Sequence, residues 1–427
     1  MPNYKKKRHS RFFSAPKPKK SKPEKTISNE EVEMTPAERY RKTTVKQNMK
    51  VVKGRKLEQK RRLKIVSIIV ATIIIVYTIF EMVLPMGVYE KVSHFFSTLG
   101  TGSYPVELDS TQTLNIINHG SHYYVLTNSK FYSINSSGKI LLSFDHGFEK
   151  PILKTSDTRA LLFDQNSNMA YIFTVSKLEN TIELQKNIIN ANISDSGSYA
   201  FVLHSDKYAS AVSVYNKKDK KVYEWFSAEN TVNNVAISPD GDKIAVSAFN
   251  AVGGKYKSVL SVLNFDSATP EYTKTFENTL VYDIESSHSG CFAIINEHSL
   301  EFIDWSDFEK KQYSNEYGIS MLRATEDGYI AVFNRKNDKT DNCVAVFKKS
   351  GELEYQFDYK GIISDITMSD GHIYCMGETE IYLLSDKGKV LRKASCGFGA
   401  VRIFVASSDS VAVITDNKIE KINLAQE

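Results

Sequence analysis

Two histidines, His119 and His122, have a spacing at which both imidazoles could reach one metal ion. No third ligand follows them at a recognisable distance, and the remaining histidines beyond residue 90 are scattered singly. A lone histidine is more often a hydrogen-bonded structural residue than a metal ligand. We therefore expect no metal site at this pair and no bound cofactor.

Aspartate recurs at one position of a repeated turn, at Asp157, Asp195, Asp240, Asp327 and Asp370. A carboxylate that returns in every turn is typical of an Asx-type bond to the local backbone rather than of catalysis. The chain contains no G-x-S-x-G elbow, P-loop or dinucleotide fingerprint that would anchor nucleophilic or phosphoryl-transfer chemistry. The sequence therefore predicts no catalytic residues.

The turns that carry these aspartates belong to a repeat that begins at about residue 103. Its clearest copy is VNNVAISPDGDKIAVSAF, residues 232–249, in which two β-runs flank a turn. Eight copies begin near residues 115, 151, 190, 233, 281, 319, 362 and 401. Steps of about 36 to 48 residues are typical of four-stranded blades. We predict an all-β fold, a β-propeller of eight four-stranded blades, or seven if the degenerate first copy merges with its neighbour.

The last copy of the repeat is short of one strand. After KIEKINL, residues 418–424, no fourth β-run follows, whereas SYPVELD, residues 103–109, precedes the first copy without a place in it. Pairing these two runs would close the ring and remove its open edges. We expect residues 103–109 to complete the last blade.

The SPDG turn at residues 238–241 resembles the strand-to-strand turn of WD-repeat-like and quinoprotein-like propellers. Together with a basic tail and one apolar segment ahead of the repeats, the chain looks like an uncharacterised family of membrane-anchored β-propellers in Gram-positive bacteria. The resemblance to propellers covers residues 103–427 and implies a fold, not a chemistry.

Two polar stretches carry the candidate partner-binding residues, and both are predicted as loops between the second and third strands of a blade. NAVGGKYK, residues 250–257, contributes Lys255, Tyr256 and Lys257, and NRKNDKTDN, residues 334–342, contributes Arg335 and Lys336. The resemblance to propellers implies that these loops emerge on one face. Flexible loops on a rigid scaffold commonly carry binding residues.

Ahead of the repeats, the twenty residues from Ile65 to Leu84 read IVSIIVATIIIVYTIFEMVL and include one charge, Glu81. At ~1.5 Å rise per residue such a helix spans roughly 30 Å of hydrocarbon. Residues 1–64 hold 22 Lys or Arg against 6 Asp or Glu, whereas the rest of the chain holds 33 against 44. By the positive-inside rule we expect a single-pass cell-membrane protein with a cytoplasmic N-terminus and an extracellular C-terminal domain.

This asymmetry divides the chain into four expected parts. They are a largely disordered basic cytoplasmic tail at 1–64, a transmembrane helix at 65–85, a juxtamembrane linker or helix at 86–102 and an extracytoplasmic propeller at 103–427. The helix and the basic tail are expected to contact membrane lipid, and the acidic propeller is expected to bind no nucleic acid.

The four cysteines and two tryptophans are expected to serve packing. The spacings of the cysteines fit neither a zinc pattern nor a dense disulfide framework, so we predict small buried hydrophobes. Trp225 and Trp305 lie near strand ends of different copies, where core or rim packing is expected.

The missing catalytic motifs favour a non-enzymatic binding or scaffold module whose propeller displays a loop face to an extracytoplasmic protein or cell-envelope glycan. The alternative is a glycan-active enzyme whose carboxylates come from different blades and therefore leave no motif. Signalling through the tail is compatible with the first hypothesis, although residues 1–64 contain no readable output domain.

Overall fold

The computed structural model divides the chain into two compact units, Met1–Val83 and Leu84–Glu427. It describes residues 35–37, 41, 44–46, 64–68, 71–72, 97–109, 112–119, 121–267, 269–286, 290–296, 299–314, 318–335, 338–415 and 417–426. Helical backbone is present at 36–37, 41, 44–46, 64–68, 71–72 and 97–98. Among these residues no helix has the length and apolar character needed to cross a membrane. Most of the predicted tail and most of the predicted membrane helix lie outside the described residues.

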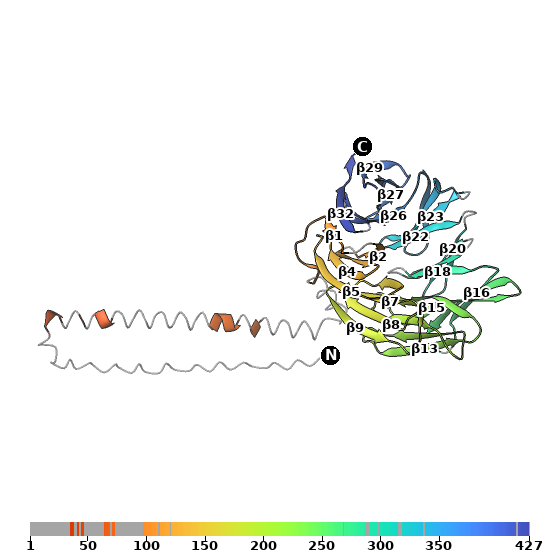
Figure 1. Cartoon of the computed structure of the whole chain (residues 1–427), viewed down its shortest axis with the longest axis horizontal. Helices are drawn as coiled ribbons and strands as arrows, with labels where there is room; N and C mark the ends of the chain where they lie inside the picture. The colour runs from red at the N-terminus through yellow and green to blue at the C-terminus, as the bar shows by residue number, and fades with distance from the viewer. Residues whose placement is uncertain are drawn as a thin grey trace, which may run out of the picture. The chain divides into compact units, whose positions relative to one another are not determined.

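The second unit is a ring of eight antiparallel sheets, the blades, each with its first strand innermost (Figure 1). Blade 1 contains β2 Thr113–Asn118, β3 His122–Thr127, β4 Lys130–Asn135 and β5 Ile140–Asp145, and blade 2 contains β6 Pro151–Thr155, β7 Arg159–Asp164, β8 Met169–Thr174 and β9 Lys177–Glu183. Blade 3 contains β10 Ile188–Ile193, β11 Tyr199–Leu203, β12 Ser210–Tyr215 and β13 Lys221–Ser227, and blade 4 contains β14 Thr231–Ile237, β15 Lys243–Val252, β16 Lys255–Asn264 and β17 Tyr272–Glu277.

Blades 5 to 8 follow the same order of strands. Blade 5 contains β18 Val281–Ser286, β19 Cys291–Asn296, β20 Ser299–Asp304 and β21 Lys310–Ser314, and blade 6 contains β22 Ile319–Thr325, β23 Gly328–Asn334, β24 Asp341–Lys348 and β25 Leu353–Lys360. Blade 7 contains β26 Asp365–Ser369, β27 His372–Met376, β28 Glu380–Leu384 and β29 Val390–Ser395. Blade 8 contains β30 Arg402–Ser407, β31 Ser410–Ile414 and β32 Lys418–Asn423, with β1 Val106–Glu107 as its fourth strand. The predicted eight-bladed, four-stranded propeller is confirmed.

Because the strands of a blade alternate in direction, the connections emerge on two faces. The turns between first and second strands and between third and fourth strands lie on one face, called here the turn face. The hairpins between second and third strands and the links to the next blade lie on the other, the hairpin face.

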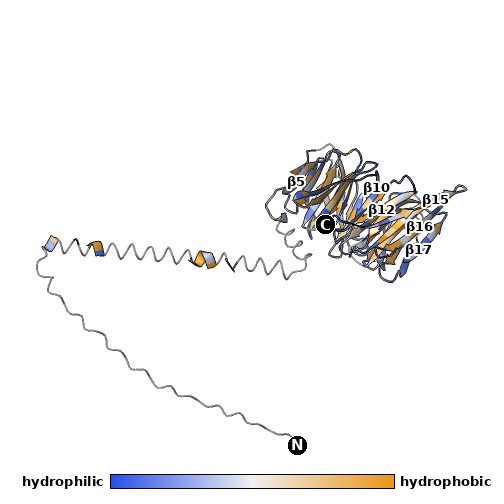
Figure 2. Ribbon diagram, turned by 90° about the horizontal axis from the view of Figure 1, so that it is seen from below, coloured by the Kyte–Doolittle hydropathy of each residue, from blue (hydrophilic) through white to orange (hydrophobic). Residues whose placement is uncertain are grey.

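Hydrophobic patterning explains why the middle strands pack inside the ring. Every residue of β3 and β11 is buried, because the second strand of a blade is covered on both sides by neighbouring blades. The outer strand β9 instead alternates between exposed and half-buried residues. Figure 2 shows this gradient as apolar residues concentrated within the blades.

Eight hydrophobic clusters fill the eight interfaces between neighbouring blades. The cluster between blades 8 and 1 contains Val106, Tyr123 and Phe404, so the ring is closed by the same kind of core as elsewhere. All four cysteines are buried free thiols, as predicted. Trp305 is 6% exposed inside the cluster between blades 4 and 5, and Trp225 is half-buried against the one between blades 3 and 4. The packing role predicted for both tryptophans is therefore confirmed.

The predicted strand exchange at the last blade is present. Val106 pairs with Ile419 and Glu107 with Lys418, which makes β1 the outer strand of blade 8. A second exchange was not predicted: β33, Ala425–Gln426, pairs with Lys393 and Arg392 of β29 and adds a fifth strand to blade 7. Segments from both ends of the domain therefore secure the ring.

Candidate functional site

The stretch predicted as a loop at residues 250–257 is a projecting β-hairpin instead. β15 and β16 remain paired as far as Val252 and Lys255, and Gly253 and Gly254 form the tip with φ of 60° and 78°. Two consecutive left-handed residues suit the tight turns of two-residue hairpins, in which glycine has no steric cost. The sequence predicted a loop because these residues are mostly polar. In the structure, β15 and β16 pair with each other here, and this pairing provides hydrogen-bond partners for their backbone groups.

This hairpin extends beyond both of its neighbours in the sheet. Pairing with β14 ends at Phe249, and pairing with β17 ends at Lys257. The ribbon past these points is exposed, and Tyr256 keeps 53% of its surface accessible. Figure 1 shows this ribbon, labelled β16, extending away from the rest of its blade.

The three predicted binding residues of the hairpin do not face the same way. Alternation along a strand places Lys255 and Lys257 on the side of β16 that carries Val259, whereas Tyr256 faces the opposite side. Lys257 Nζ lies 3.5 Å from Glu277 Oε1, and both side chains are largely exposed. A single flat partner surface therefore cannot contact all three equally.

Arg335, predicted for the same role, is engaged within its own blade. Its guanidinium donates two hydrogen bonds to the carboxylate of Asp358 and lies 3.9 Å from Asp341. The neighbouring Asp358 raises the pKa of Arg335. Lys336 lies outside the described residues. The structure thus brings together the three hairpin residues and leaves Arg335 two blades away.

A groove of about 240 Å³ lies at the base of the hairpin, between blades 3 and 4. One wall is formed by Trp225, Phe226 and the link at 227–230, and the other by middle strands of blade 4. Its lining residues in blade 4 are Val246, Ala248, Val259 and Ser261. The groove therefore presents polar and apolar surface in similar amounts, and it lies on the side of β16 that carries the two lysines.

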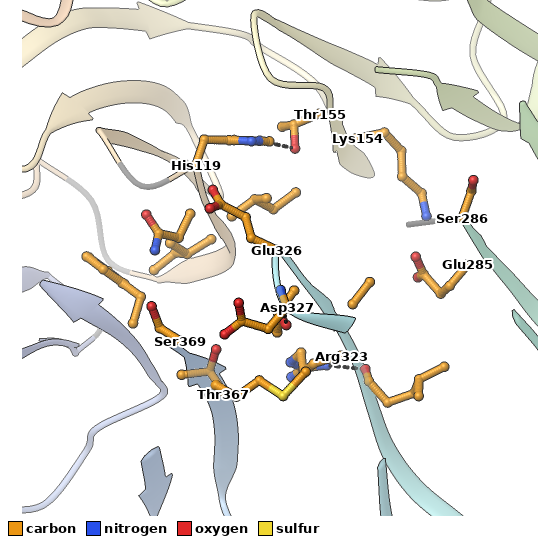
Figure 3. A pocket seen from close by; sticks show the side chains of 18 of the residues that line it. His119, Lys154, Thr155, Glu285, Ser286, Arg323, Glu326, Asp327, Thr367 and Ser369 are labelled. Atoms are coloured by element: carbon orange, nitrogen blue, oxygen red, sulfur yellow. Dashed lines mark hydrogen bonds between the residues drawn. The ribbon is translucent and has the colours of Figure 1, made fainter. Parts of the chain in front are cut away.

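A larger cavity of about 530 Å³ occupies the centre of the ring (Figure 3). All eight innermost strands line it, and the turn residues Asp195, Pro239, Asp327 and Asp370 extend it to the turn face. Its lining contains six carboxylates and three Lys or Arg side chains. This balance disfavours anionic ligands such as nucleic acid.

Two arginines share one carboxylate deep in this cavity. Asp365, whose side chain is 3% exposed, lies 3.1 Å from Arg323 Nη2 and 3.5 Å from Arg402 Nη1. It also accepts a hydrogen bond of 3.0 Å from the Ile403 amide. Burial raises the pKa of Asp365, and the adjacent Arg323 opposes that shift. The group joins blades 6, 7 and 8 and stabilises the ring wall.

Lys154 extends from blade 2 toward Glu285 of blade 5 (Figure 3). The Glu285 charge raises the pKa of Lys154 and keeps the ammonium protonated. Burial raises the pKa of Glu285, and Lys154 counteracts it. Asp365 is thus held by two arginines, whereas Glu285 is influenced by Lys154 through charge and by the neighbouring Asp283, which raises its pKa.

The predicted histidine pair lies at the cavity mouth without a metal-binding arrangement. His119 Nε2 lies 2.8 Å from Thr155 Oγ1, and its ring stacks on His122 at 5.4 Å between centroids. His119 Nδ1 is 3.9 Å from Asp157, beyond hydrogen-bond distance. No group of three or more His, Cys, Asp or Glu within the described part of the chain could hold a metal ion.

The repeated turn aspartates act differently from the expected Asx bonds. In the SPDG turn, the Ser238 hydroxyl accepts from the amides of Asp242 and Lys243 at 3.2 and 3.0 Å. Among the described residues, the carboxylates of Asp240 and Asp370 accept no hydrogen bond. The expected Asx bond is therefore wrong for these two residues. In the turn of Asp240, the Ser238 hydroxyl accepts from the backbone amides instead.

The chain enters the propeller on the turn face. Asn135, at the turn between the third and fourth strands of blade 1, donates from Nδ2 to the carbonyls of Thr98 and Gly100 at 2.9 and 3.0 Å. Ser137 donates to Gly100 at 2.9 Å and accepts from the Gly102 amide at 3.1 Å. These contacts anchor residues 98–102 on the face opposite the projecting hairpin.

Comparison with solved structures finds other proteins of similar fold. The crystal structure of BamB from Moraxella catarrhalis has a TM-score of 0.49 and 11% identity, covering 76% of this chain and 99% of that chain. A chain of the mitotic checkpoint complex has a TM-score of 0.46 and 12% identity, covering 77% and 92%. At such identities the similarities say nothing about function.

No curated protein matches the chain in sequence. One family model matches residues 101–424, almost the whole propeller with its eight blades and its exchanged first strand. That family is described as a family of unknown function, DUF5711. The match extends over more than half of the chain, and the chain therefore belongs to the DUF5711 family.

Proposed function

We propose that this protein is a non-enzymatic binding module, tethered to the cell membrane, whose propeller docks an extracytoplasmic protein on its hairpin face. The proposal rests on two structural features that lie on opposite faces of the propeller. Residues 98–102 join the propeller on the turn face, and the projecting β15–β16 hairpin leaves the hairpin face. A tether on one face leaves the other accessible to a partner.

The apolar segment at 65–84 and the excess of Lys and Arg before it support the tether and its orientation. In this arrangement membrane lipid contacts the helix and the basic tail, and the propeller lies outside the cell. A cell-envelope glycan is a less suitable partner for the hairpin face, because the projecting ribbon exposes a tyrosine and two lysines rather than a polar pocket.

Binding rather than catalysis is supported by the central cavity. Asp365 and Glu285, the interior carboxylates best placed to act as acid and base, interact with Arg323, Arg402 and Lys154. His119 Nε2 lies 2.8 Å from Thr155 Oγ1, and the Asp157 carboxylate is 3.9 Å from His119 Nδ1. A glycan-active enzyme therefore finds less support than a scaffold.

Shortening the hairpin tests the proposal. Replacing residues 250–257 by Asn-Gly keeps the pairing of Phe249 with Ser258 and removes the projecting ribbon. Crosslinking in intact membranes, followed by identification of attached proteins, should lose the partner in this variant while the melting temperature changes little.

The matched control carries K218A and K220A, two exposed lysines in the turn between the third and fourth strands of blade 3. This variant changes the turn face and should keep the partner. Retention of the crosslink by the shortened hairpin, or its loss in the control alone, would refute docking on the hairpin face.

A further inference from the structure

The groove between blades 3 and 4 has a shape that follows from the hairpin. β15 and β16 continue past β14 and β17, and the groove lies beside their paired part, at Val246, Ala248, Val259 and Ser261. Its floor stays open because Ala248 and Ser261, a cross-strand neighbour of Val246, are small residues between larger ones. The resulting groove has a volume of about 240 Å³ and is open to solvent.

An exposed aromatic pair lies on the side of blade 3 that faces blade 2, away from the side on which Trp225 meets the groove. Phe226 is 44% exposed and Tyr208 is 43% exposed, and their ring centroids are 4.9 Å apart. Both belong to blade 3 on the hairpin face, at the end of β13 and in the link between β11 and β12. Ala211, the cross-strand neighbour of Phe226, belongs to the cluster between blades 2 and 3, so Trp225 is the aromatic side chain of β13 that faces the groove.

The charges above the groove are positive on the hairpin side. Lys255 and Lys257 precede Val259 by four and two residues, so all three side chains lie on the same side of β16. Lys255 makes no ion pair within the described residues, and the pair of Lys257 with Glu277 is solvated and therefore weak. Opposite them, Glu229 stands on the rim formed by blade 3.

We infer that this groove binds a protein segment in which an aromatic side chain is flanked by carboxylates. The aromatic ring fills the groove against Trp225 and Val259, and the flanking carboxylates pair with Lys255 and Lys257. This inference rests on the proposed function, since it names the partner chemistry of the same face. A basic segment is disfavoured because both lysines would repel it.

The test uses full-length protein in detergent micelles and three fluorescently labelled peptides. The first places one phenylalanine between pairs of acidic residues, the second replaces that phenylalanine by alanine, and the third surrounds it with lysines. Fluorescence anisotropy should show binding of the first peptide, and loss of either feature should weaken binding by about tenfold or more. Equal binding of the acidic and the basic peptide would overturn the inference.

Variants locate the site. K255E/K257E should reverse the preference between the acidic and the basic peptide, whereas K218E/K220E, with the same change in charge on the turn face, should keep it. V259W should fill the groove and abolish binding, and E229Q should tighten it. An unchanged affinity in K255E/K257E at an unchanged melting temperature would contradict the assignment.

Tryptophan fluorescence gives a second measurement of peptide binding in the groove. Trp225 lines it, and Trp305 is the other tryptophan of the chain. In a W305F variant, the acidic aromatic peptide should shift or quench the remaining fluorescence, and the alanine peptide should not. If no peptide binds while the shortened hairpin still loses its crosslinked partner, the groove inference fails and the proposed function stands.

Discussion

Val106 pairs with Ile419, so the first strand of the propeller completes its last blade. Deleting residues 103–109 removes Val106 and Leu108, both 5% exposed, from the cluster that closes the ring. The loss of two buried aliphatic side chains should cost about 3–6 kcal/mol and lower the melting temperature by roughly 5–10 °C. Removing residues 425–427 instead should cost less, because β33 contributes two residues to a blade that already has four strands. A melting temperature unchanged by the first deletion would exclude the closure as a source of stability.

Arg159 connects blades 2 and 3 through a buried guanidinium. It is 6% exposed, donates to the carbonyls of Gly197 and Lys217 at 3.0 and 3.2 Å, and pairs with Glu179 and Asp219. R159M should destabilise the protein by about 2–4 kcal/mol, because it leaves two carbonyls and two carboxylates without their donor.

The control for Arg159 is Lys186, whose pair with Asp206 is exposed. K186M should change the unfolding free energy by about 1 kcal/mol or less in chemical denaturation. Equal effects of the two substitutions would show that the guanidinium contributes little.

His146 should make stability depend on pH. It is 4% exposed, its Nδ1 accepts from the Phe148 amide at 3.0 Å, and its Nε2 is 3.1 Å from the Thr127 carbonyl, an arrangement that requires the neutral ring. Burial lowers the pKa of His146. The His146 ring therefore binds a proton more readily in the unfolded chain than in the folded chain. The free energy of unfolding should fall as pH decreases below about 6.5. Denaturation between pH 7.5 and 5.5 should show a shallower slope for H146Q, and identical slopes would contradict this assignment.

The electrostatic interaction between Lys154 and Glu285 can be measured by a double-mutant cycle. K154M leaves the Glu285 charge without its partner, so it should destabilise the protein more than K154M/E285Q does. We expect a coupling of about 0.5–3 kcal/mol. Additive effects of the two substitutions would mean that the charges are screened by water in the cavity.

The proposed membrane orientation can be tested with protease. In intact cells carrying an N-terminal epitope, external protease should leave the epitope intact if, as proposed, the basic excess keeps the tail inside. Loss of the epitope before permeabilisation would refute the orientation. Epitope loss only after permeabilisation is the expected result.

The sequence revealed the ring because every blade repeats the same two buried β-runs. The first strands were expected near residues 115 and 401, and they begin at Thr113 and Arg402. Pairing at Val106 could be predicted because the last copy lacked a strand. The short strand β33 could not be predicted, because two residues, Ala425 and Gln426, carry no periodicity.

The candidate site was harder to predict, because its parts come from different blades. The groove combines Trp225 of one blade with Val259 of the next, and no local pattern indicates which partially buried residues will leave a space between blades. The triad of Arg323, Asp365 and Arg402 has the same origin. In the hairpin, the Gly253–Gly254 pair was the available signal for a tight turn, whereas the polar residues around it suggested a loop.

The exchange of β1 into blade 8 also sets the timing of folding. Ribosomes deliver Val106 early and Ile419 late, so the cluster between blades 8 and 1 cannot form during most of synthesis. Until then Tyr123 lacks the surface of Phe404 and blade 8 that buries it to 1% exposure. The nascent domain thus displays an unpaired sheet edge and an aromatic surface until its final strand is made. A chaperone that shields aromatic segments would therefore be needed for longest at blade 1, the first blade to be synthesised.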